Sequence, residues 1–151
     1  ASQTVLNAVF PDLNYKVNTN GSVFAITLQR LAEWRSNVGS TALALVIDFV
    51  HRVEGQSYQD TARQLSDGYV FLYEDTDNPD RSRPYRSPFY LQLLASTHLS
   101  AIVDHVDIPA LNTDSLATYC MHGIFVACTI ALERALRFIR DKVIDVDAIL
   151  E

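Results

Sequence analysis

The chain has 151 residues, of which 48% are hydrophobic and 20% charged, and it contains five glycines and five prolines. This composition excludes a disordered or low-complexity chain, and the length suffices to bury a core without a metal or a disulfide framework. The formal net charge of −6 argues against binding of nucleic acids or membrane surfaces through the field of the whole protein. The net charge does not exclude a local basic patch.

The opening segment predicts a short helix over residues 4–9. This helix should stop at Pro11, because proline disfavours helical geometry in the residue before it. Residues 13–21 are rich in asparagine and glycine and predict an irregular loop. Ser22 can then cap a helix with one apolar stripe, and we expect Gly39 to end that helix.

A second core helix is predicted over residues 41–54, apolar on most faces and closed by Gly55. Ser57 should cap a third helix that continues to Leu72, although Gly68 weakens its middle. The sequence YVFLY at residues 69–73 is rich in residues that favour strands. A short strand or an early helix end there therefore remains open.

Residues 74–86 form the one long loop, with a charge pattern that changes from acidic to basic. Ser87 followed by Pro88 is a strong helix start, and this helix should end near Val106. The last long helix is predicted over residues 114–144, followed by a short turn from Asp145.

The stretch ATYCMHGIFVACTIAL, residues 117–132, contains few polar groups. A helix that is apolar all round must be buried on every side, so it is either the central helix of the domain or half of an oligomer interface. Gly123, Ala127 and Ala131 recur every four residues and leave a shallow groove for another helix of the same or another chain. With residues 41–53, residues 116–139 should form the core of an all-α, single-domain bundle of five or six helices spanning residues 1–151.

The two cysteines, Cys120 and Cys128, are eight positions apart on this predicted helix. Their Cα atoms would be about 12 Å apart, too far for a disulfide. Both should be reduced, as in the cytoplasm or another reducing compartment. The longest apolar run falls short of the roughly 20 residues that cross a bilayer, so we expect no membrane contact.

Asp48 interrupts an apolar run, and His51 and Arg52 follow on its side of the helix at spacings of three and four. A desolvated carboxylate beside an imidazole can tune proton transfer near neutral pH. Asp48 and His51 are therefore weak candidates for an acid–base site. The alternative, which we favour, is a salt bridge from Asp48 to Arg52 at the edge of the core.

The histidines do not have the spacing that places two ring nitrogens on one metal ion from one helix. The acidic residues 74–80 lack the glycine and the final glutamate of an EF-hand. We therefore expect no metal site and no cofactor.

The basic residues Arg81, Arg83 and Arg86 are concentrated in the sequence RSRPYR, with Tyr85 between them. Arginine makes planar, bidentate contacts with phosphate, and an adjacent aromatic ring suits single-stranded nucleic acid. Arg137 on the last helix could extend such a nucleic-acid or partner-binding surface. The alternatives are neutralisation by the preceding acidic residues or contact with an acidic patch on a neighbouring subunit.

Residues 10–17, FPDLNYKV, are similar to a segment of rod-shaped plant virus coat proteins, which are also small, acidic and helical. The similarity covers eight residues near the N-terminus rather than in mid-chain, and the rest of the sequence does not follow that family's pattern. It assigns no family.

Glycine-rich phosphate loops, nucleophile elbows and CxxC pairs are missing from the sequence. We therefore predict a non-catalytic α-helical assembly or protein–protein interaction module, of which a self-associating structural subunit is one form. One alternative is a coat- or nucleocapsid-like protein that covers nucleic acid with its arginine loop. The other is a small enzyme that uses Asp48 and His51.

Overall fold

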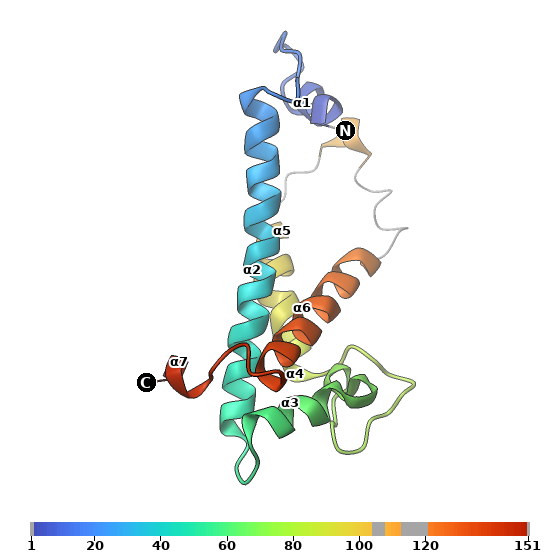
Figure 1. The fold of residues 1–151 in the computed structure, drawn as a ribbon. Coiled ribbons are helices and arrows are strands. Elements are labelled where there is room, and N and C mark those ends of the chain that lie inside the picture. Colours follow the sequence, from blue (N-terminus) through green and yellow to red (C-terminus); the bar gives the residue numbers. More distant parts are fainter. Residues whose placement is uncertain (1, 104–107, 113–120, 151) are drawn as a thin grey trace.

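The computed structural model describes residues 2–103, 108–112 and 121–150, and this part of the chain is helical and contains no strand. The all-α class predicted from the sequence is thereby confirmed (Figure 1). The helices are α1 (Ser2–Val9), α2 (Ser22–Arg52), α3 (Tyr58–Ser66), α4 (Pro88–Leu94), α5 (Ser100–Ile102), α6 (His122–Arg140) and α7 (Asp147–Leu150). Short 3-10 turns, η1 (Asp67–Leu72) and η3 (Pro109–Leu111), and a π-helical turn, η2 (Ala95–Leu99), complete the chain.

The longest element, α2, is one continuous helix of 31 residues, so the predicted break at Gly39 is wrong. Glycine inside a helix costs about 1 kcal/mol relative to alanine. Val38 and Ala42 on either side of it are buried, and so is Val46 one turn further on. Burial of these side chains against the rest of the protein offsets the cost, and the helix continues.

The third helix ends early, at Ser66, which confirms the early-end alternative and corrects the expected continuation to Leu72. Gly68 and Tyr69 both have left-handed backbone angles, with φ of 61° and 57°, and the chain turns there into η1. Two of the three predicted caps are confirmed, whereas the cap expected at Ser22 is wrong because Gly21 occupies the N-cap position of α2 without a side-chain hydrogen bond. The Ser57 hydroxyl accepts a hydrogen bond from the Asp60 amide at 3.1 Å. The Ser87 hydroxyl accepts one from the Tyr90 amide at 3.2 Å.

The last long helix ends at Arg140 rather than at Ile144. Lys142 adopts a left-handed φ of 55°, and the Val143 amide donates back to the Phe138 carbonyl at 2.9 Å. This pattern is the Schellman motif that closes many helices. The short C-terminal turn expected after Asp145 is present as α7. The predicted start of α6 and the predicted end near Val106 fall on residues outside the described part of the chain.

The core forms where α6 packs against α2 and α3 (Figure 1). Leu132, Leu136 and Ile139 of α6 are completely buried, and so are Val46 and Val50 of α2, to within 1%. The helices α3 and α4 complete this core with their own buried side chains. Both predicted core segments therefore contribute to it.

The central helix α6 is nevertheless not buried on every side. Val126 and Ile130, on its other face, are 57% and 58% exposed. The expectation of all-round burial is therefore wrong for the described part of this helix. Packing within the described part of the chain does not account for this exposed apolar face of α6.

Replacement of Gly39 by alanine should raise the free energy of unfolding by about 0.5–1 kcal/mol, because the position is helical and an added Cβ meets no atom within 4 Å. Urea denaturation measures this change. The Gly55→Ala variant is the control, and it should be less stable than the parent because Gly55 has a φ of +82°. A loss of stability in Gly39→Ala would contradict the continuous helix.

Replacement of Leu132 by alanine should lower the free energy of unfolding by about 2–5 kcal/mol, since the side chain is fully buried. The Ile130→Ala variant, two positions away on the exposed face, should change it by no more than about 0.5 kcal/mol. Equal losses in the two variants would mean that the exposed face of α6 is covered in the folded protein.

Candidate functional site

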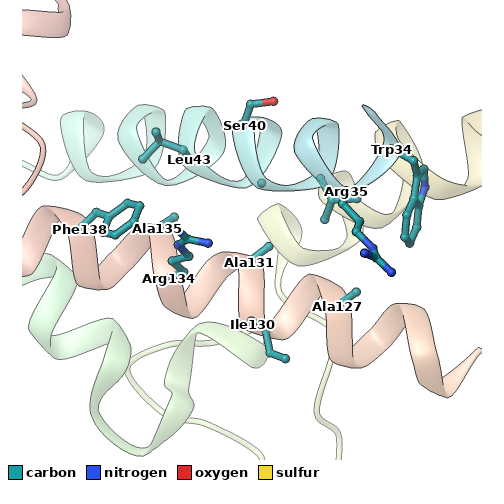
Figure 2. A pocket seen from close by; sticks show the side chains of 12 residues that line it. Trp34, Arg35, Ser40, Leu43, Ala127, Ile130, Ala131, Arg134, Ala135 and Phe138 are labelled. Atoms are coloured by element: carbon teal, nitrogen blue, oxygen red, sulfur yellow. The ribbon is translucent and has the colours of Figure 1, made fainter. Parts of the chain in front are cut away.

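An open groove of about 480 Å³ runs between α2 and α6 (Figure 2). The two helices run in the same direction along it, with Trp34 and Ala127 at one end and Leu43 and Phe138 at the other. At 1.5 Å per residue, the α2 side is about 14 Å long and the α6 side about 16 Å. This length matches about three turns of a third helix.

Small residues line much of the groove, namely Gly39 from α2 and Ala127, Ala131 and Ala135 from α6. Their short side chains allow another backbone to approach closely. The spacing of Gly123, Ala127 and Ala131 predicts such a shallow groove, and the structure places both alanines in it, whereas Gly123 does not line it. The exposed side chain of Ile130 also lines the groove, so the uncovered face of α6 borders this site.

Aromatic side chains stand at the two ends of the groove. Trp34, half-buried, packs edge-on against His98 of η2, with ring centroids 6.2 Å apart. Phe138 lies under the guanidinium group of Arg134, 5.1 Å from it. Large apolar rings at both ends and small residues between them make a surface suited to an apolar helix face.

Two arginines also line the groove, Arg35 from α2 and Arg134 from α6. Figure 2 shows both guanidinium groups in the space between the two helices. In residues 2–103, 108–112 and 121–150, neither forms an ion pair with a carboxylate. The groove is thus apolar with positive charge on both of its walls.

The candidate acid–base pair has the geometry of a surface ion pair. The Asp48 carboxylate contacts the Arg52 guanidinium at 2.7 Å, and both side chains are more than half exposed. The His51 ring lies 3.4 Å from the Tyr58 hydroxyl. Asp48 and His51 thus have separate partners, and neither residue lines the groove between α2 and α6. This arrangement favours the salt-bridge alternative.

The arginines of the loop lie among carboxylates. Arg83 is 3.7 Å from Asp80, and with Arg86 it lines a hollow of about 240 Å³ that Glu74 and Asp75 also line. Hydrogen bonds from Ser82, and to a smaller extent the charge of Arg86, lower the pKa of Asp80, so this carboxylate stays ionised to a lower pH than an ordinary aspartate. The arrangement favours neutralisation within the loop.

The other predicted members of the basic surface have different surroundings. The Arg81 guanidinium lies so close to Gly68 that a Cβ there would come within 3.1 Å of it. The Tyr85 ring stacks on Phe125 of α6, with centroids 5.5 Å apart and an angle of 12° between the planes. Arg137 is exposed on α6, where its charge helps to lower the pKa of Asp141 after the larger effect of Arg140.

The described residues contain no group of three histidine, cysteine or acidic side chains that could hold a metal ion. Cys128 is a free, buried thiol, and Cys120 lies outside the described part of the chain, so its redox state stays a prediction. None of the helices in this part combines the length and apolar character that crossing a bilayer requires.

Sequence reasoning missed four of the groove residues as a site: Trp34, Arg35, Arg134 and Phe138. They lie about 100 positions apart in two groups, and the expected break at Gly39 placed Trp34 and Leu43 on different helices. One signal was available. No acidic residue stands three or four positions from Arg35 or Arg134, so neither arginine has a carboxylate at the spacings that favour ion pairs along a helix.

The fold and the groove define an all-α protein built on a long helix, with an open apolar groove beside that helix. Residues 7–105 match the family described as "Domain of unknown function (DUF6532)". The chain belongs to this family, and the match includes α2 and the arginine loop, whereas α6 follows it in the sequence. No curated protein and no solved structure matches the chain.

Alkaline pH should destabilise the protein through two buried groups. Burial raises the pKa of Cys128 from 9.0 to about 11 and, as the main cause, that of Tyr90 from 10.0 to about 12. The unfolded chain releases these protons first, so their contribution to stability is complete below pH 9 and is lost as the pH rises through 11 and 12.

Urea denaturation at successive pH values tests this expectation. The free energy of unfolding should fall from pH 9 to 11, and less steeply in a Cys128→Ala variant than in the parent. A parent chain with constant stability over this range would contradict the buried positions of both groups.

Proposed function

We propose that this chain is a non-catalytic α-helical interaction module whose groove between α2 and α6 receives a helix of a protein partner. The observation that carries the proposal is the open groove itself, about 480 Å³ in volume and lined by small, apolar and aromatic side chains. Amphipathic helices bind in hydrophobic grooves of this kind through apolar residues on one face. The exposed side chain of Ile130 supports the same interpretation.

Exposed apolar side chains also continue beyond the groove along α2. Ile26, Leu28 and Leu31, in the N-terminal half of this helix, are each about half exposed. Figure 1 shows that half extending past the bundle toward α1. Large uncovered apolar residues on one long helix are typical of a surface that another protein covers. We propose a reducing compartment such as the cytoplasm for this interaction, given the buried free thiol of Cys128.

The alternative functions have less support. The nucleic-acid-coating proposal depends on Arg81, Arg83 and Arg86, and carboxylates of the same loop surround two of these arginines. It would gain support from retention of RNA on filters that disappears steeply with salt. The enzyme proposal depends on Asp48, whose carboxylate is engaged by Arg52.

Trp34 is the only tryptophan of the chain and lies at one end of the groove, so its fluorescence reports on the groove directly. The probe is a synthetic helix of about 14 residues with a leucine face, glutamine on both flanks and a cross-link on its far side that keeps it helical. Titration with this neutral helix should shift the emission of Trp34 to shorter wavelength, because the helix covers the half-buried ring.

A Gly39→Leu variant should block the groove, and Gly39→Ala is its matched control. Leucine favours helix, and nothing lies within 4 Å of the Cβ position, so the variant should fold while its side chain fills the groove. Binding of the neutral helix should weaken by about tenfold or more, whereas Gly39→Ala should bind almost as well as the parent. If a monomeric parent shows no fluorescence change with this helix or with a charged version of it, or if Gly39→Leu binds equally well, the proposed function is wrong.

A further inference from the structure

The two walls of the groove each carry one arginine, Arg35 on α2 and Arg134 on α6. Both side chains are exposed, and Figure 2 shows their guanidinium groups between the helices. Arg134 also lies over the Phe138 ring at 5.1 Å, a cation–π contact that favours its position beside the groove. A helix lying between the walls would have one arginine facing each of its flanks.

These two arginines differ from most others in the chain. Five arginines contact a carboxylate in the described residues: Arg30, Arg52, Arg63, Arg83 and Arg140. The groove arginines do not, although the chain as a whole carries a net charge of −6. The groove is therefore a locally positive, apolar surface on an acidic protein.

Charge complementarity then selects among helices that have the same apolar face. Carboxylates on both flanks would meet the two guanidinium groups, with which they form strong charge-assisted hydrogen bonds. Lysines at the same positions would be repelled by the arginines, and uncharged flanks would neither attract nor repel them. We infer that the partner helix is acidic and amphipathic, with carboxylates on both sides of its apolar face. This inference rests on the proposed function of the groove.

Two further helices test the inference with the fluorescence of Trp34. They share the leucine face and cross-link of the neutral probe and carry glutamate or lysine on both flanks. At low salt the glutamate helix should bind about fivefold more tightly than the neutral helix, as expected for two exposed ion pairs, and the lysine helix more weakly. The difference should shrink at about 1 M salt, where the Debye length is about 3 Å.

Charge reversal provides the matched controls. The double variant Arg35→Glu/Arg134→Glu should reverse the order, so that the lysine helix binds more tightly than the glutamate helix. The double variant Arg52→Glu/Arg63→Glu changes the net charge equally but alters surface pairs outside the groove. It should keep the order of the parent, since the net charge alone does not set it.

The outcomes separate the two proposals. Equal binding of all three helices, blocked by Gly39→Leu, would overturn the acidic partner and leave the helix-binding groove in place. The acidic partner would also be overturned if the Arg52→Glu/Arg63→Glu variant lost the preference for the glutamate helix. If none of the helices binds and light scattering finds a dimer that dissociates in Arg35→Glu/Arg134→Glu, a second copy fills the groove and the acidic partner helix is overturned.

Discussion

The packing of α6 against α2 is the contact on which the rest of this structure depends. Leu132, Leu136 and Ile139 bury one face of α6 completely, and the branched side chains of Val46 and Val50 meet them from the α2 side of the core. Burial of a side chain of this size contributes about 1.5–3 kcal/mol. That contribution holds α2 helical through Gly39 and fixes which face of α6 turns outward, so the core and the groove have one common cause.

The groove remains open because two helices alone cannot enclose the space beside their contact. Small residues at Gly39, Ala127 and Ala131 leave room where larger side chains would fill it. Exposed apolar surface on Ile130 has no stabilising role in the isolated chain. This apolar surface lies beside a groove about three turns long, and a third helix in the groove would cover it. In the part of the chain that the structure describes, the arginines on the two walls form no ion pair, so the proposed partner helix would be selected by its charge.

Local signals in the sequence predicted the parts of the fold that depend on local chemistry. Two helices start at serines, Ser57 and Ser87, whose hydroxyls accept hydrogen bonds from otherwise free backbone amides. Each of these amides belongs to a residue only three positions further on, so the signal is local. Gly39 could not be judged in this way, since its helical state depends on burial of its neighbours by distant segments. The groove was predicted only on its α6 side, from the spacing of Ala127 and Ala131, and the α2 wall was missed. An all-apolar helix does not indicate which face is buried, and the two walls lie about 100 residues apart.

The most direct test of the helix-binding groove is amide hydrogen exchange of the chain with and without a bound leucine-faced helix. Binding should slow exchange in two separate segments, residues 34–43 and 127–138, because both walls lose their local opening motions when a third helix packs on them. The loop at residues 74–86 should exchange as before. Protection confined to that loop, or to the helix turn around Asp48 and His51, would contradict the account and place binding elsewhere.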